Sequence, residues 1–134
     1  MFRALLDKLK LGLTKTRNLF AGVAGLFRLK GKVDHDFLKE HTTHVLDYLG
    51  QIDDTSWEEI VAQSGLTLVE IEQAARMYAK GKNVIMCWAM GITQHRHSVP
   101  TIQEIANLML LRGNVGKPGA GLCPVRGHSH VQGD

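Results

Sequence analysis

The chain has 134 residues, of which 44% are hydrophobic and 22% are charged, and its net charge is +3. This length suits one ordinary domain, and this composition excludes an intrinsically disordered chain. No run of 18 apolar residues occurs, so no membrane-spanning helix is expected. The two cysteines, Cys87 and Cys123, form no C-x-x-C pair, which excludes zinc-ribbon and thioredoxin-type sites and favours a reducing cytoplasm.

The charge is divided unevenly along the chain. Residues 1–32 carry eight Lys or Arg and one acid, whereas residues 33–134 carry eight bases and twelve acids. Phe and Leu recur at helical spacing among the early bases, which predicts a basic amphipathic helix. This pattern is typical of a helix on an anionic membrane surface, but also of a helix that packs its apolar stripe against its own domain. We therefore expect two parts, a helical segment over 1–32 and a domain over 33–134.

Residues 12–38 read GLTKTRNLFAGVAGLFRLKGKVDHDFL. This stretch resembles the start of the bacterial signal recognition particle receptor, in which a basic amphipathic segment precedes a GTPase and contacts anionic lipid. The resemblance implies a membrane-targeting module, peripheral at the inner face of the membrane. The GTPase itself is not expected, because no phosphate-binding G-x-x-x-x-G-K-[ST] loop occurs.

From Val33 onward the pattern predicts alternating helices and one strand. Asp34 or Asp36 is suited to cap a helix through His41, and the apolar group at residues 45–49 continues that helix or begins another. A capping box, Thr67-x-x-Glu70, marks the start of a later helix. The expected elements are helices near 56–63, 67–80 and 101–112 and a buried strand near 83–89, which together predict an α/β unit.

Polar and glycine-rich loops flank the last expected helix. The segment after the strand reads GITQHRH, and the segment after the helix reads GNVGKPGAGLCPVRGHSHVQGD. So many glycines let backbone N–H groups approach a large anionic ligand closely. We expect the Gln94 loop to face the Gly116–Gly121 loop across the C-terminal edge of the strand, where ligands of open α/β folds bind.

Three segments carry a second resemblance. They read SWEEIVAQSGL, IEQAARMYAKGKNVIMCWAMGITQHRHSV and NLMLLRGNVGKPGAGLCPVRGHSHVQGD. In this order they resemble the molybdopterin-dependent oxidoreductases of the formate dehydrogenase type, from about Val33 to Asp134. The resemblance implies a helix-rich piece of a Rossmann-like domain. It also implies the cofactor of that family, molybdopterin guanine dinucleotide with molybdenum or tungsten, which performs the redox step while the protein binds and orients it.

Carried over by position, the resemblance implies a set of cofactor-binding residues. Arg126 is the natural partner of the cofactor's phosphates because a guanidinium binds anions bidentately. Gly113 is expected to act as a helix cap only. His130 stands where the family pattern has Asn, which puts the contact at that position in question. The expected cofactor-binding residues are Gly91, Thr93, Gln94, His95, Asn114, Gly116, Gly119, Gly121, Arg126, Gly127, His128 and Gln132.

The histidines and cysteines allow other interpretations. His95 with His97, and His128 with His130, form two His-x-His pairs, so a small metal-binding protein is an alternative. His35, His41 and His44 are expected to be solvated helix residues. Cys87 is expected to be a buried thiol within the strand.

The chain is much shorter than members of the resembled family. It has neither their four-cysteine cluster motif nor an assignable metal-ligating residue. We therefore expect a truncated or chimeric chain that contributes part of a cofactor wall, has no catalytic residue of its own and does not turn over alone. No nucleic-acid partner is expected. The main alternative function is the membrane-surface module in residues 1–32.

Overall fold

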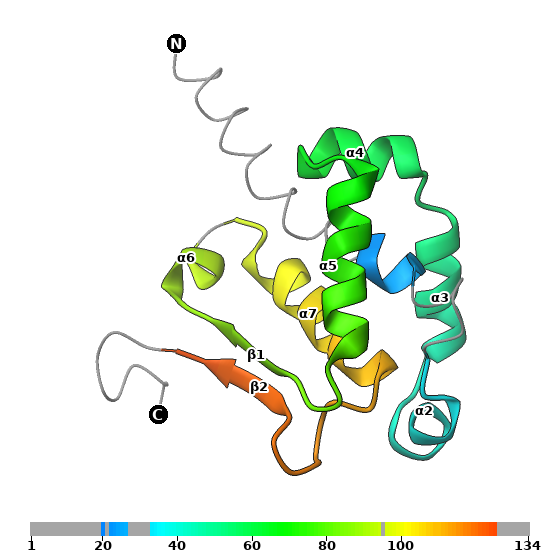
Figure 1. Ribbon diagram of the computed structural model, residues 1–134, viewed down its shortest axis with the longest axis vertical. Coiled ribbons are helices and arrows are strands. Elements are labelled where there is room, and N and C mark those ends of the chain that lie inside the picture. Colours follow the sequence, from blue (N-terminus) through cyan, green and yellow to red (C-terminus); the bar gives the residue numbers. More distant parts are fainter. Residues whose placement is uncertain (1–19, 21, 27–32, 95, 126–134) are drawn as a thin grey trace.

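The computed structural model describes residues 20, 22–26, 33–94 and 96–125. Residues 20 and 22–26 are helical, and the remaining described residues form six further helices and two strands. The result is a helix-rich α/β arrangement with a two-stranded parallel sheet (Figure 1). The elements are α2 (His35–His41), α3 (Val45–Asp53), α4 (Trp57–Ser64), α5 (Leu68–Lys80), β1 (Ile85–Trp88), α6 (Met90–Thr93), α7 (Ser98–Leu111) and β2 (Gly121–Pro124).

Side-chain caps set the starts of α4 and α5. Ser56 accepts a hydrogen bond from the backbone N–H of Glu59, and Gly65 ends α4 in a left-handed conformation. Thr67 and Glu70 form the expected capping box, in which the Glu70 carboxylate accepts from the Thr67 backbone N–H at 2.8 Å. These bonds satisfy N–H groups that a helix start leaves without intrahelical partners.

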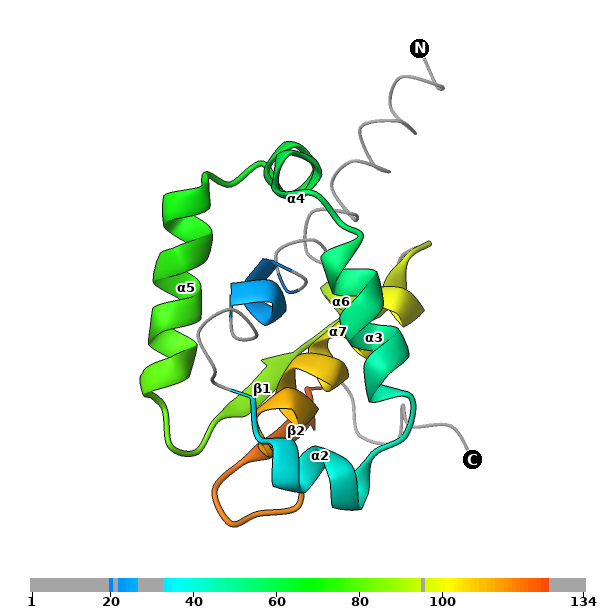
Figure 2. The ribbon, with the colours of Figure 1, turned by 90° about the vertical axis from the view of Figure 1, so that its right-hand side faces the viewer.

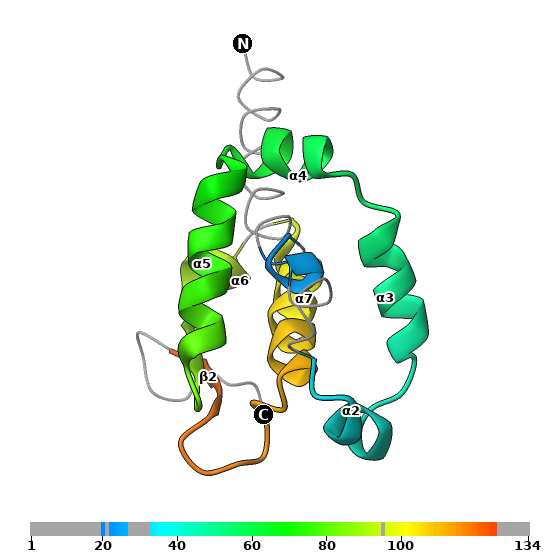
Figure 3. The ribbon, with the colours of Figure 1, turned by 45° about the vertical axis from the view of Figure 1, so that its right-hand side comes forward.

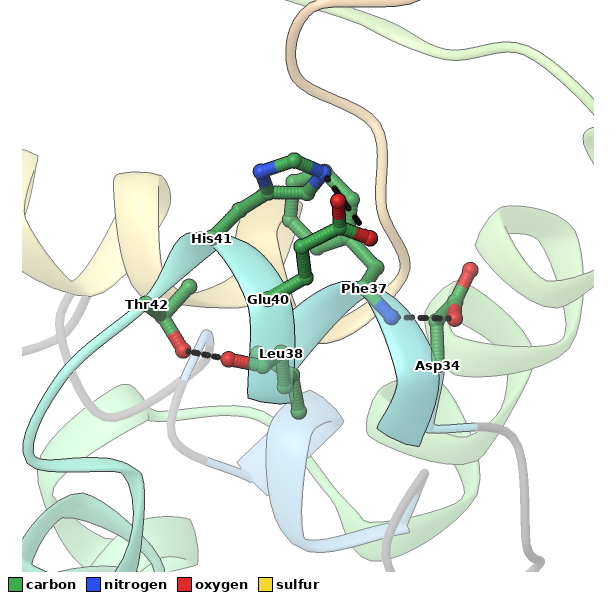
Figure 4. A network of polar contacts seen from close by, with 6 residues as sticks. All are labelled: Asp34, Phe37, Leu38, Glu40, His41 and Thr42. Carbon is green, nitrogen blue, oxygen red and sulfur yellow. Dashed lines mark hydrogen bonds and ion pairs between the residues drawn. The ribbon is translucent and has the colours of Figure 1, made fainter.

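A similar cap begins α2 (Figure 4). The Asp34 carboxylate accepts from the Phe37 backbone N–H at 3.1 Å, and the Thr42 hydroxyl donates to the Leu38 carbonyl at 2.6 Å at the other end. Residues 45–49 therefore begin a separate helix, α3. His35, His41 and His44 are exposed, as expected.

The two strands run parallel and in register. Ile85 pairs with Gly121 and Trp88 with Pro124, and the chain crosses from β1 to β2 through α6 and α7. The strand near 83–89 was expected to be buried, and this is wrong: the side chains of β1 alternate between exposed and half-buried. Cys87 is exposed for the same reason, because one face of this small sheet has no covering layer among the described residues.

The core gathers residues from both sides of residue 32. Val23, Ala24 and Leu26 are buried in one cluster with Ile60 and Ile71. Their short helical segment lies among α3, α4, α5 and α7 (Figures 2 and 3). A Cβ built on Gly22 would stand 3.0 Å from the Ile60 side chain, so this segment packs closely. For residues 22–26 the apolar stripe therefore faces the protein's own core.

The C-terminal ends of α5 and α7 are joined by polar contacts. The Tyr78 hydroxyl donates to the Leu108 carbonyl at 3.1 Å and accepts from the Asn114 amide at 3.0 Å. The Arg112 guanidinium donates to the carbonyls of Ala79 and Gly81, both at 3.3 Å, near the end of α5. These bonds use carbonyl groups that the end of a helix leaves without intrahelical partners.

Gly113 ends α7 in the way the sequence predicted. Its φ is +57°, its N–H donates to the Leu110 carbonyl, and the Asn114 N–H donates to the Met109 carbonyl at 2.9 Å. This pair of bonds is a Schellman motif. The helix itself begins at Ser98, three residues earlier than expected, because Pro100 is tolerated in the first turn, where its missing N–H costs nothing.

Apolar side chains are exposed over several elements, as expected. Leu46, Met77, Val99 and Ile85 are exposed by 83%, 76%, 63% and 56%. Among the described residues, no helix combines the length and hydropathy needed to cross a bilayer.

Candidate functional site

The parallel pairing divides the expected cofactor-binding residues between two edges of the sheet. Seven of the twelve lie among the described residues, and five (His95, Arg126, Gly127, His128 and Gln132) lie outside them. Residues after β1 stand at the C-terminal edge, whereas residues between α7 and β2 stand at the N-terminal edge or lead to it.

The C-terminal edge holds Gly91, Thr93 and Gln94. They form the short helix α6 and its C-cap in place of the expected loop. A Cβ built on Gly91 would meet no atom within 4 Å, and Gln94 is exposed. Thr93 is half-buried, and its hydroxyl donates to the Met90 carbonyl at 3.4 Å.

The last described residue lies at this same edge. The Val125 N–H donates to the Trp88 carbonyl at 2.7 Å, which extends the pairing one step past β2. Val125 therefore lies at the C-terminal edge, beside the end of β1. Among the expected cofactor-binding residues that the structure describes, Gly91, Thr93 and Gln94 thus share the C-terminal edge.

Gly116, Gly119 and Gly121 lead into the opposite edge. The φ angles of Gly116 and Gly119 are +77° and +75°. A Cβ on Gly119 would stand 3.3 Å from the Asn83 amide, and the Lys117 ammonium donates to the Lys82 carbonyl at 3.0 Å, both just before β1. The expectation that this loop faces the Gln94 loop is therefore wrong. A strand of four residues separates the two edges by about 10 Å, because a helical crossover returns the chain to the start of a parallel strand.

Asn114 is buried, with 1% of its surface exposed. Its amide N–H donates to Tyr78, while its Oδ1 accepts no hydrogen bond within the described residues. Burial of the hydroxyl raises the pKa of Tyr78, and the Asn114 and Arg112 groups oppose this shift. Asn114 thus lies between α5 and α7, away from the C-terminal edge.

Two other features bear on the site. A cavity of about 240 Å³ lies between α2, α3 and α7, and none of the twelve expected residues lines it. No cluster of three or more His, Cys, Asp or Glu suited to a metal ion occurs within the described ranges. Of the two histidine pairs, only His97 is described, so the metal-binding alternative stays a prediction.

The sequence did not predict strand β2 or the two cysteines that β2 brings side by side. Cys123 in β2 stands directly opposite Cys87 in β1, and both thiols are free and exposed. Desolvation raises the pKa of the Cys87 thiol, and the adjacent Cys123 thiol raises it further. The strand signal was weak because β2 has only four residues, begins with glycine and ends with proline.

Known proteins similar to this chain include two from Escherichia coli and one from Mycobacterium tuberculosis. The chain is 43% identical over 102 residues to protein YdeP of Escherichia coli K12, which covers 76% of this chain and 13% of that protein. It is 42% identical over 122 residues to the oxidoreductase Rv2900c of Mycobacterium tuberculosis. This match covers 87% of this chain and 16% of that protein. It is 39% identical over 100 residues to formate dehydrogenase H of Escherichia coli K12. This match covers 75% of this chain and 14% of that protein. No family model matches the chain.

These matches identify a segment that the chain shares with oxidoreductases. The chain is similar to parts of them only, since it spans 13% to 16% of their length. The mycobacterial match leaves 13% of this chain uncovered. The uncovered part is therefore shorter than the 32-residue segment at the start of the chain. The match therefore extends into residues 1–32, in agreement with the packing of residues 22–26 in the core. The resemblance of this segment to the signal recognition particle receptor finds no counterpart among these relatives.

Proposed function

We propose that this chain is a piece of a formate dehydrogenase-type molybdopterin oxidoreductase and forms one wall of its cofactor site. Similarity to formate dehydrogenase H over three quarters of the chain carries the proposal. The position of Gly91, Thr93 and Gln94 after a parallel strand supports it, because ligands of open α/β sheets bind at the carboxyl ends of strands. The parent domain would be Rossmann-like.

The described part of the C-terminal edge fits a large polar ligand. Gly91 leaves open space where a side chain would stand, so a ligand can approach its backbone. The exposed Gln94 amide offers both a donor and an acceptor to the ring of a pterin. Arg126, the next residue in the sequence after Val125, would bind the dinucleotide phosphates. Bound there, the molybdenum or tungsten pterin group would supply the two-electron redox chemistry.

The other expected residues receive a different role in this proposal. Gly116, Gly119 and Gly121 shape the turn that brings β2 beside β1 in register. Asn114 holds the end of α7 against Tyr78. These four residues would position the strand that leads to Arg126, and the groups that contact the cofactor would come from the C-terminal edge.

A segment exchange tests the proposal. The matching segment of formate dehydrogenase H is replaced by residues 33–134 of this chain, and molybdenum per enzyme and formate oxidation are measured. Arg126→Ala should lower cofactor affinity by roughly 10- to 100-fold, because a hydrogen bond to a charged group contributes about 1.5–3 kcal/mol. Gln94→Ala removes neutral contacts only and should cost less.

Arg76→Ala is the matched control for this experiment. Arg76 lies on α5 and forms an exposed ion pair with Glu72 at 3.3 Å, an interaction of small energetic weight. Molybdenum content should be unchanged in this variant. Full molybdenum occupancy in Arg126→Ala would assign that arginine another role, and loss of occupancy in Arg76→Ala would show that the assay reports folding only.

A further inference from the structure

The open face of the sheet carries two thiols side by side. Cys87 and Cys123 are register partners in neighbouring parallel strands, so their side chains leave the sheet on the same side. Both are free and exposed. The neighbouring position on this face, Ile85, is also exposed, by 56%, so the described residues leave the pair accessible.

The spacing of parallel strands decides what can join these thiols. In-register Cα atoms lie about 4.8 Å apart, and parallel side chains keep nearly that separation at Cβ. A disulfide needs Cβ atoms about 3.5–4.5 Å apart and sulfur atoms about 2.05 Å apart. A direct S–S bond would therefore draw the strands together and strain their pairing.

A single bridging ion suits the spacing better. With metal–sulfur bonds of about 2.3 Å, two thiolates on one ion lie about 3.8 Å apart at a tetrahedral angle and about 4.6 Å apart when linear. These separations match the distance between strands. The described residues bring no third Cys, His, Asp or Glu to the pair, so this part of the chain offers the ion two protein ligands.

We propose that Cys87 and Cys123 form a two-thiolate site for a soft, thiophilic ion, with Cu(I) as the representative ligand. Thiolates select soft ions such as Cu(I), whereas Zn²⁺ takes four ligands, more than this pair supplies. Binding is a ligand exchange without electron transfer: two thiols lose their protons, one Cu(I) forms two Cu–S bonds, and two protons are released. The pair lies on the open face of the sheet, whereas the proposed cofactor wall lies at its C-terminal edge.

The test uses the reduced full chain under anaerobic conditions with Cu(I) delivered from a chromogenic chelator. One Cu(I) per monomer should transfer, with release of two protons in weakly buffered solution. Cys87→Ser and Cys123→Ser should each weaken Cu(I) affinity by about 100-fold or more, because a second ligand on the same molecule raises affinity by about 10²–10⁴. Circular dichroism should show unchanged folding, since both positions are exposed.

The double variant Ile85→Cys with Cys87→Ser is the matched control. It keeps two exposed thiols on the same face but moves one of them two residues along β1, about 8 Å from Cys123 between Cα atoms. It should bind Cu(I) no better than the single-cysteine variants. Binding equal to the unaltered chain, or half a Cu(I) per chain with dimers in size-exclusion chromatography, would overturn the proposal. Ready formation of an intramolecular disulfide with glutathione disulfide, without loss of stability, would overturn the argument from strand spacing.

Discussion

Gly113 shows how much one residue contributes where α7 ends. Its φ of +57° is costly for any residue with a side chain, and a Cβ there would stand 2.8 Å from the Asp34 carboxylate. Gly113→Ala should lower the free energy of unfolding by about 1–2 kcal/mol. Gly50→Ala is the control: Gly50 lies within α3 with no atom near a built Cβ, so the change should raise stability by about 0.5–1 kcal/mol. Urea denaturation of both variants measures the difference, and equal effects would contradict this explanation.

Tyr78 is the second residue whose removal should be measurable. Tyr78→Phe removes a donor to Leu108 and leaves the buried Asn114 amide without its acceptor, so stability should fall by about 1–3 kcal/mol at pH 7. Because burial raises the Tyr78 pKa above 10.0, its contribution is present below pH 10 and is lost as the pH rises through the folded-state pKa. The gap between the two proteins should therefore shrink above pH 10, and a constant gap would show that the hydroxyl does not titrate with folding.

At the scale of elements, the start of α5 depends on its capping box. Thr67→Ala should cost about 1 kcal/mol, because the side chain accepts from the Glu70 N–H. Hydrogen bonds from the Thr67 backbone N–H and then from its hydroxyl lower the pKa of Glu70 below 4.5. The ionised carboxylate therefore stabilises the fold above pH 4.5, and this contribution is lost as the pH falls through the lower folded-state value.

Glu70→Gln tests the acid part of that prediction. The variant keeps the side-chain shape but does not titrate, so its stability should vary less than that of the unaltered chain between pH 5 and the onset of acid unfolding. Thermal unfolding across this range measures the difference. Parallel curves for the two proteins would place the pH dependence elsewhere in the chain.

Helices α4 and α5 could be predicted from sequence because their signals are local. Thr67 and Glu70 mark the start of α5 by side-chain chemistry within one turn, and the structure confirms this capping box. Ser56 caps α4 through an equally local hydrogen bond. The position of β1 was predicted correctly, but the prediction that β1 is buried was wrong. Burial depends on which elements cover the sheet, and the local sequence does not encode this. β2 was missed because four residues between Gly121 and Pro124 carry too little pattern.

The residues of the candidate site stay a prediction, and the arrangement expected for two of its loops is wrong. The sequence grouped Gln94 with the Gly116–Gly121 loop because both are polar, glycine-containing segments. Their separation follows from the parallel pairing of β1 with β2, a contact between residues 36 positions apart along the chain, Cys87 and Cys123 among them. No local spacing encodes that register.

For the whole molecule, the exposed apolar surface and the partial coverage of the relatives lead to one prediction. The purified chain should hold no complete molybdenum cofactor and should show no formate-dependent dye reduction. A working site needs several chain segments held in fixed geometry, and this chain matches 14% of formate dehydrogenase H. Metal analysis together with a dye-reduction assay tests this, and robust turnover by the 134-residue chain would overturn it.

The parallel pairing of β1 and β2 also has a consequence for how the chain tolerates sequence change. The two edges of the sheet lie at opposite ends of the strands, so substitutions at each edge should be visible in different readouts. In a variant library of a full-length relative, changes at positions equivalent to 113–121 should reduce protein abundance in cells, because they disturb turns with positive φ. Changes at positions equivalent to 91–94 should leave abundance near normal while reducing growth that depends on the enzyme. Selection would thus act separately on the two edges of a sheet whose strands are only four residues long.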